Sequence, residues 1–275
     1  MFKSNSILLA ACGGSALLAL SCGSFASAAV IYQDSFARSG SLAGTTPAPT
    51  DTGSVKWGTS INGGMTAKTN GSELVLAQSS GQYAVGNGYL TYTPPASGTI
   101  TLSAGFTVGT VAGTGTGTGG WGMLGFESST GGDNPSGRGP NVTLQAGANY
   151  VIASPVSQGG TGTGYETIPG FVSGSSTVLT ITYDISTETA QWYSQTGTNS
   201  PSLLYTYDYA TNHVAAPTIT AVEAGMWASS ANNKTPEVVD VQNFTLTAVP
   251  EPATLGLVAV GALGLLLLKR RKASV

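Results

Sequence analysis

Apolar and polar residues alternate strictly along much of this chain, and this alternation restricts it to a sheet protein. In residues 99–108 the even positions carry isoleucine, leucine, alanine, phenylalanine and valine, and the odd positions carry threonine, serine and glycine. Successive side chains of a strand point to opposite faces, so such a run buries one face and leaves the other in water. The apolar spacing of helices is absent between Val30 and Ala248. The sequence therefore predicts an all-β domain.

The same alternation predicts a hairpin, in which residues 179–183 and 190–193 are joined by the short polar turn Asp184–Glu188. The next predicted strand places Leu203, Tyr205 and Tyr207 on one face. Further candidate strands are residues 30–36, 73–78, 82–93, 120–128, 218–228 and 237–248. About ten or more short strands in one domain favour a two-sheet antiparallel sandwich, such as a jelly roll, over a barrel or propeller.

Two glycine-rich segments, residues 110–120 and 129–139, interrupt this pattern and flank the strand 121–126. Glycine loses much conformational entropy on ordering, so both are predicted to be mobile loops. Simple spacers are the favoured interpretation, and binding loops at the strand ends are the alternative.

The N-terminus has the features of a secretory signal peptide, which we place at residues 1–28. Lys3 gives a positive start, residues 7–20 are mostly apolar, and Ala26-Ser27-Ala28 is a small-residue cleavage site. Cys12 follows Leu9-Ala10-Ala11, so a lipoprotein box is an alternative. Both cysteines lie in this segment, and residues 29–248 therefore have no disulfide or thiol chemistry.

The C-terminus combines three parts: Val249-Pro250-Glu251-Pro252, an uncharged run over residues 253–268, and the cations Lys269, Arg270, Arg271 and Lys272. The prolines favour an extended segment that a protease can reach. As a helix, the apolar run would extend roughly 24 Å at about 1.5 Å per residue, a thin membrane span. The cations hold the C-terminus in the cytoplasm, which leaves the preceding domain outside.

This combination resembles the PEP-CTERM sorting signal that exosortases recognise. The resemblance implies export and transient anchoring in the inner membrane by residues 253–268. It also implies processing near Pro250, Glu251 and Pro252 by an exosortase-type partner, and delivery to the cell surface or extracellular matrix. An ordinary membrane anchor that is never cut is the alternative. The residues between the two terminal signals, 29–248, form the predicted exported domain.

A second resemblance covers most of the exported domain. The opening run Asp34–Gly40 with Trp57, the strand 121–126, the hairpin and the closing run 239–246 are similar to concanavalin A-like and LamG-like sandwich domains. The resemblance implies a fold and leaves function open, because such sandwiches include lectins, hydrolases and structural domains.

No constellation of catalytic residues is evident, so the sequence predicts a protein that is not an enzyme. Concanavalin-like glycosidases use Glu-x-Asp-x-Glu on one strand, and this triplet does not occur. Asp184 with Glu188 lies in a turn, and Glu237 and Asp240 fall on opposite faces of a strand. The only histidine, His213, lies in a polar connection without a Gly-x-Ser-x-Gly elbow elsewhere.

The charge of the exported region and its metal-ligating residues restrict the possible partners and cofactors. Residues 30–249 carry twelve acidic residues against five basic ones, which argues against nucleic-acid binding. No cofactor is predicted, although Asp133-Asn134 or Asp240 with Asn243 could supply oxygen ligands to one structural Ca²⁺. The metal site is therefore left unknown, and a strand-orienting role for Asp240 is favoured.

Glycan binding would require exposed aromatic side chains, and the candidates are Trp57, Tyr83, Tyr89, Tyr193 and Trp227. Tyr193 is selected because it falls on the polar side of its strand, whereas Trp121 and Trp192 are interpreted as packing residues. The leading hypothesis is an exported structural or adhesive component of a polysaccharide matrix. A lectin-like glycan-binding module and a polysaccharide-active enzyme are the second and third.

Overall fold

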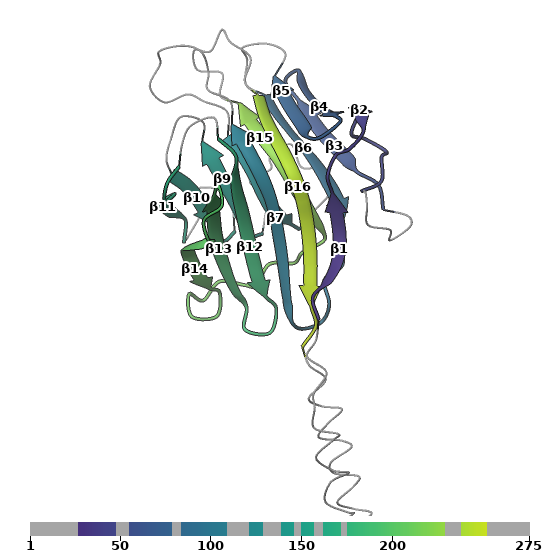
Figure 1. Ribbon diagram of the computed structural model, residues 1–275. Coiled ribbons are helices and arrows are strands. Elements are labelled where there is room, and N and C mark those ends of the chain that lie inside the picture. Colours follow the sequence, from purple (N-terminus) through teal and green to yellow (C-terminus); the bar gives the residue numbers. More distant parts are fainter. Residues whose placement is uncertain are drawn as a thin grey trace, which may run out of the picture. The chain divides into compact units, whose positions relative to one another are not determined.

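The computed structural model describes residues 27–47, 55–78, 84–108, 121–128, 139–145, 150–156, 162–171, 175–228 and 238–251. Within these residues every regular element is a β-strand, and all strand pairs are antiparallel in two sheets (Figure 1). The predicted all-β sandwich is confirmed. The predicted signal helix and the helix 253–268 lie outside the described residues. None of the described ranges holds a helix long and apolar enough to cross a membrane.

One sheet has nine strands. Its spatial order is β14 (Ser202–Asp208), β13 (Thr189–Thr196), β12 (Thr177–Asp184), β7 (Thr99–Val108), β16 (Val238–Val249), β5 (Leu74–Gln78), β4 (Met65–Asn70) and β2 (Ser39–Ser41), with β1 (Ala29–Asp34) also paired to β16. The other sheet has seven strands, in the order β11 (Gly164–Thr167), β10 (Tyr150–Ser154), β9 (Asn141–Gln145), β8 (Trp121–Glu127), β15 (Ala221–Ala228), β6 (Ala84–Thr91) and β3 (Gly58–Asn62).

Strand β16 lies in the middle of the nine-stranded sheet, between β7 on one side and both β5 and β1 on the other (Figure 1). Its first residues pair with β5 and its last residues with β1. An irregularity between Gln242 and Thr245 separates the two parts, and Asn243 there has a φ of 50°. Asparagine tolerates this left-handed conformation better than most residues.

The core fills the space between the sheets, as the alternation predicts. Ile100, Leu102 and Phe106 of β7 are fully buried, and Leu124 and Phe126 of β8 approach from the other sheet. Packing of the two inward faces is the main source of stability in such a sandwich.

Trp192 shows how tightly the sheets are matched. It is fully buried, and its indole Nε1 donates a hydrogen bond to the backbone oxygen of Asn141 in the other sheet at 2.9 Å. Its predicted role as a packing residue is confirmed. On the opposite sheet, a Cβ added at Gly122 would stand 2.9 Å from Phe106, so glycine is required there for close packing.

The hairpin formed by β12 and β13 is confirmed. The two strands pair without interruption from Thr177 opposite Thr196 to Asp184 opposite Thr189. The Asp184 carboxylate accepts hydrogen bonds from the backbone N–H groups of Ser186 and Thr187 in the turn. Strands were also found where they were predicted around β1, β5, β6, β8, β15 and β16.

Six strands were not predicted, namely β2, β3, β4, β9, β10 and β11. Strand β9 illustrates one reason, because all five of its residues are buried. A strand buried on both faces does not need polar residues at alternate positions, so the period-two signal is lost.

The predicted face of Leu203 is wrong. A register shift between β13 and β14 places Leu203 opposite Tyr193, on the outer face, where 53% of Leu203 is exposed. Leu204 and Tyr205 pack against the core instead, and Tyr207 is buried. The bulge inserts one extra residue into β14, so the residues before it point to the opposite face from the one that strict alternation predicts.

Asp34 is buried at the end of β1 and holds the opening segment in place. Its carboxylate accepts hydrogen bonds from the Trp57 indole at 2.6 Å and from the Phe36 N–H at 2.8 Å. The Arg38 guanidinium binds both carboxylate oxygens, at 2.8 and 2.7 Å. This two-point geometry makes a strong ion pair, and the extra donors compensate the buried charge.

We expect Asp34→Ala to lower the free energy of unfolding by about 3–5 kcal/mol, because Arg38 and the Trp57 indole would lose their acceptor inside the protein. Chemical denaturation of both proteins measures this difference. Asp208→Ala is the control, because Asp208 accepts hydrogen bonds only within an exposed turn. Equal losses in the two variants would contradict a special role for Asp34.

Candidate functional site

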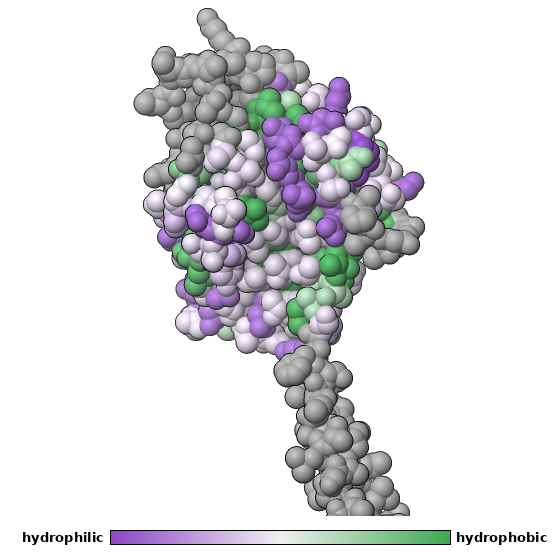
Figure 2. All heavy atoms as spheres, viewed as in Figure 1, coloured by the Kyte–Doolittle hydropathy of each residue, from purple (hydrophilic) through white to green (hydrophobic). Residues whose placement is uncertain are grey.

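The outer face of the nine-stranded sheet presents hydroxyl groups in rows. Each row crosses β16, β7 and β12 in that order. The first row consists of Thr247, Thr101 and Thr182, and the second consists of Thr245, Ser103 and Thr180. The Thr180 hydroxyl donates to the Ser103 hydroxyl at 3.1 Å. Figure 2, which views the molecule from this side, shows pale residues of intermediate hydropathy over much of the sheet. The face can form many hydrogen bonds and is mostly uncharged.

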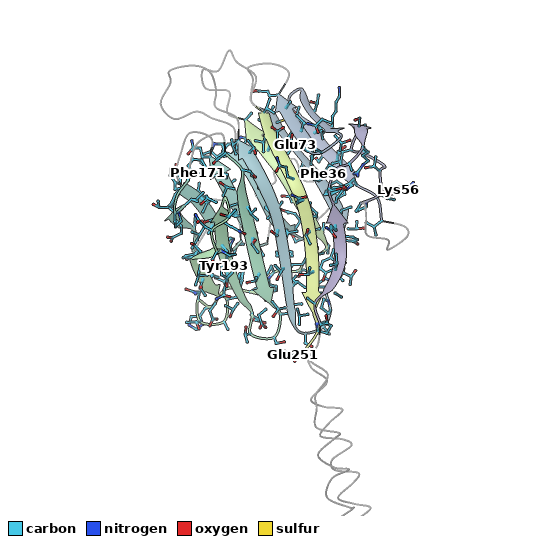
Figure 3. The ribbon with its side chains drawn as sticks, viewed as in Figure 1. Phe36, Lys56, Glu73, Phe171, Tyr193 and Glu251 are labelled. Carbon is cyan, nitrogen blue, oxygen red and sulfur yellow. The ribbon has the colours of Figure 1, made fainter. Side chains whose placement is uncertain are left out.

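Tyr193 lies on this face, as the sequence predicted (Figure 3). It is partly exposed, stands opposite Leu203, and its hydroxyl donates to Gln191 Oε1 at 2.9 Å. An exposed leucine beside a tyrosine with a hydrogen-bonded hydroxyl forms a small amphipathic patch. Its role in glycan binding stays a prediction.

The outer face of the seven-stranded sheet is different, because its centre is buried. Four buried apolar residues on it lie outside the main core: Val85, Met123, Ile152 and Ala221. Buried polar residues accompany them on the same face, including Asn87, Glu127, Asn141, Thr143, Ser154 and Glu223. Buried polar groups on an outer face are unusual, and they single out this face as the candidate site.

Glu127 of β8 and Glu223 of β15 form a carboxyl pair on this face. The register places Glu127 opposite Ala221 and Glu223 opposite Gly125, so the two side chains are diagonal neighbours. The carboxyl groups hydrogen bond to each other, and the Asn87 side-chain amide donates to Glu223. Burial raises the pKa of Glu223 well above its ordinary value, and the adjacent Glu127 raises it further. The neutral form of Glu223 is therefore the one that this buried face stabilises.

The geometry of this pair bears on its chemistry. Retaining glycosidases hold their two carboxyl groups about 5 Å apart and inverting enzymes hold them farther apart, so that a sugar or water fits between them. Carboxyl groups that hydrogen bond directly leave no such space. The sequence did not predict this pair, because its members come from strands far apart in the chain.

A row of aromatic side chains crosses the same face beyond the carboxyl pair. Trp227 of β15 lies opposite Trp121 of β8, with ring centroids 5.7 Å apart. Gln145 of β9 follows Trp121 and accepts a hydrogen bond from the Tyr150 hydroxyl of β10 at 2.6 Å. The Tyr150 ring lies 6.2 Å from that of Tyr165 on β11. We call these five residues the aromatic band.

The other predicted aromatic candidates have mixed outcomes. Trp57 is buried and bonded to Asp34, so its suggested role as an exposed platform is wrong. Tyr83 lies outside the described residues. Tyr89 and Trp227 are partly exposed on the outer face of the seven-stranded sheet. Trp121 packs between strands as predicted, although its place is this outer face and not the core.

The remaining polar candidates are placed as follows. His213 is exposed in a turn with a φ of 57°, which confirms it as a surface residue. Asp133, Asn134 and Glu237 lie outside the described residues, as do residues 110–120 and 129–138. Asp240 is partly buried, and burial, followed by the nearby Glu73, raises its pKa.

The described residues contain no group of three or more His, Cys, Asp or Glu side chains arranged to hold a metal ion. Asp240 and Asn243 do not form such a group: Asn243 is exposed in the β16 bulge, and Asp240 lies near Glu73.

The sorting signal begins at the end of the last strand. Pro250 and Glu251 are exposed, while Pro252, the apolar run 253–268 and the cations Lys269, Arg270, Arg271 and Lys272 lie outside the described residues. Residues 248–272 match the PEP-CTERM protein-sorting motif. The chain therefore carries this motif at its C-terminus, which marks an exported protein that an exosortase sorts to the cell surface.

The described fold is similar to that of legume lectins. Lectin I-B4 from Griffonia simplicifolia, in a metal-free form, has 17% identity and a TM-score of 0.43 over 72% of this chain and 95% of the lectin. Peanut lectin, solved with a 9mer peptide, has 15% identity and a TM-score of 0.48 over 81% of this chain and 98% of the lectin.

The exoplasmic/lumenal domain of VIP36, in a Ca²⁺/Man3GlcNAc-bound form, is also similar, with 12% identity and a TM-score of 0.49 over 68% of this chain and 84% of that domain. No curated protein matches the sequence significantly. The sequence identities are all below 20% and the TM-scores are all below 0.5, so the similarity is one of overall fold only. The sandwich is defined by its own strand pairing.

The carboxyl pair predicts that stability falls as pH rises. The folded protein keeps a proton on Glu223 that the unfolded chain releases above about pH 4.5, so the free energy of unfolding decreases from that pH toward the raised pKa. In Glu223→Gln this decrease should be smaller, though not absent, because Asp240 acts in the same direction. Denaturant unfolding from pH 4.5 upward measures both profiles.

Glu166→Gln is the matched control, because Glu166 lies on β11 of the same sheet and is partly exposed. The decrease in the free energy of unfolding should be smaller in Glu223→Gln than in Glu166→Gln. Equal decreases in the two variants would show that the carboxyl pair is not the source.

Proposed function

We propose that this protein is a non-enzymatic structural or adhesive component of an extracellular polysaccharide matrix. The observation that carries the proposal is the junction between the sandwich and the sorting motif. The motif match begins at Ala248, inside β16, and β16 ends at Val249. Processing near Pro250, Glu251 and Pro252 would therefore release a sandwich that keeps all its strands.

The route to the matrix follows from the tail. Residues 253–268 would hold the chain transiently in the inner membrane, with Lys269, Arg270, Arg271 and Lys272 on the cytoplasmic side. An exosortase-type enzyme would then separate the domain from this anchor. Both steps leave the sandwich outside the cytoplasm, where an extracellular polymer can meet it.

The chemistry of the outer surface supports adhesion to a polysaccharide. The hydroxyl rows of β16, β7 and β12 offer donors and acceptors of the kind that sugars also carry. A single hydrogen bond contributes only about 0.5–1.5 kcal/mol net, so a flat array of them suits broad adhesion better than tight recognition. The exported region carries more acidic than basic residues, which favours uncharged polymers over anionic ones.

The proposal has no enzymatic step. Glu127 and Glu223 hydrogen bond to each other, which is not the spacing of glycosidase carboxylates, and His213 is an isolated surface residue. A polysaccharide-active enzyme would need a different constellation. Enzymatic release of sugars by the purified protein would contradict this part of the proposal.

A lectin-like glycan-binding module is the second candidate function. The aromatic band favours this second function. Its rings lie on an outer face with one amide between them, an arrangement that resembles a sugar-binding platform more than core packing. The two functions are compatible, because an adhesive matrix protein needs at least one contact with the polymer.

We expect the surface-derived protein to lack residues 253–275 when its intact mass is measured. Replacing Pro250, Glu251 and Pro252 together by alanine should prevent processing and leave the chain in the membrane fraction. Pro201→Ala, a substitution of an exposed proline outside the motif, should be processed normally.

Two outcomes would count against the proposal. A surface form that retains residues 253–275 would show that the tail is an uncut anchor. A processed form that never copurifies with matrix polysaccharide would overturn the structural or adhesive role.

A further inference from the structure

The aromatic band is the most distinctive surface of the described residues. Trp121, Tyr150 and Trp227 are partly exposed, and 65% of Tyr165 is exposed. None of the four contributes to the core cluster between the sheets. Large aromatic side chains gathered on an outer face, away from the core, commonly mark a binding site.

The strand pairing fixes the direction of the band. It runs across the strands from β15 through β8, β9 and β10 to β11. Trp227, Trp121 and Gln145 stand opposite one another, and Tyr165 lies diagonally from Tyr150. Four strand spacings of about 4.8 Å each give it a length of about 19 Å. An elongated ligand that lies across the strands would contact all four rings, whereas a compact ligand would contact one or two.

The polar groups of the band suggest the chemistry of the ligand. Gln145 lies between the tryptophan pair and the tyrosine pair, is 8% exposed, and accepts a hydrogen bond at its Oε1 from the Tyr150 hydroxyl. Its amide NH₂ can donate to a ligand, and the Tyr150 hydroxyl can accept from one. Rings that offer flat apolar faces, with donors and acceptors between them, suit a polymer of sugar rings.

Charge selects among such polymers. The band itself contains no charged residue, and Glu127 and Glu223, the acidic groups of this face, are buried. The exported region as a whole is acidic. An anionic polysaccharide would be repelled, and the band has no cation to compensate for that repulsion.

We propose that the aromatic band, formed by Trp121, Gln145, Tyr150, Tyr165 and Trp227, binds a linear, uncharged polysaccharide across the strands of the seven-stranded sheet. This inference rests on the proposed matrix function and names the polymer class and the face that holds it. It also separates the binding face from the face of Tyr193, which lies on the other sheet.

The test uses the processed protein in affinity electrophoresis and pull-down with cellulose, mannan and curdlan as uncharged linear polymers and with alginate as the anionic one. Binding is expected to at least one uncharged polymer and not to alginate. Tyr165→Ala should weaken that binding about tenfold, a loss of about 1.4 kcal/mol, because the most exposed ring of the band would be removed. Tyr165 is largely exposed, so this variant should keep the wild-type melting temperature.

Trp121→Ala should weaken binding at least as much, and its melting temperature reports any loss of packing against Trp227. Tyr193→Ala tests the competing site on the nine-stranded sheet, and this inference expects that variant to keep the wild-type affinity. Loss of binding in Tyr193→Ala with none in Tyr165→Ala would overturn the inference in favour of the other sheet.

The remaining outcomes separate this inference from the proposed function. If no uncharged polymer binds, yet the protein still copurifies with its own matrix, the proposed binding at the aromatic band is wrong and the proposed matrix function stands. If alginate binds and the uncharged polymers do not, the inference is overturned. If the processed protein is absent from the matrix, the proposed function itself fails.

Discussion

The buried carboxylate of Asp34 is the interaction on which the arrangement of the first part of the chain depends. It connects β1 of the nine-stranded sheet with Trp57, which immediately precedes β3 of the seven-stranded sheet. Phe36 follows with a φ of 54°, a strained value for a phenylalanine, and the hydrogen bond from its N–H to Asp34 stabilises that conformation. The Trp57 ring then packs 5.1 Å from Phe244 of β16. One charged group therefore fixes the entry of the chain into both sheets and the packing of an aromatic cluster between them.

The sandwich buries acidic groups in two different ways. The Asp34 carboxylate forms an ion pair with Arg38 and accepts hydrogen bonds from two N–H donors, an arrangement that suits a structural role. Among the described residues, the neighbours that act on Glu223 are Glu127 and Asn87, and burial raises its pKa. The arrangement at Glu223 weakens as pH rises, because the neutral form is the stabilised one.

The two outer faces differ in a way that fits a surface protein. The face of the nine-stranded sheet is an array of hydroxyl groups with the partly exposed Tyr193 beside the exposed Leu203. The other face combines a buried polar centre with aromatic side chains. Strand β16 belongs to the first sheet and leads directly into the sorting motif. A protein that is released by cutting beyond its last strand can keep both faces available to a polymer. The aromatic band then supplies the more specific contact, and the hydroxyl rows supply many weak ones.

The sequence by itself determined the all-β class, the two-sheet sandwich and the sorting signal, because alternation, composition and a short contiguous motif are local properties. It also identified the hairpin of β12 and β13 and the surface position of His213. It could not determine the face of Leu203, since a bulge shifts the alternation by one residue, nor strand β9, since burial on both faces removes the alternation. The Glu127–Glu223 pair and the aromatic band were decided only by the tertiary structure. Their residues come from β8, β9, β10, β11 and β15, and only the cross-strand register makes them neighbours.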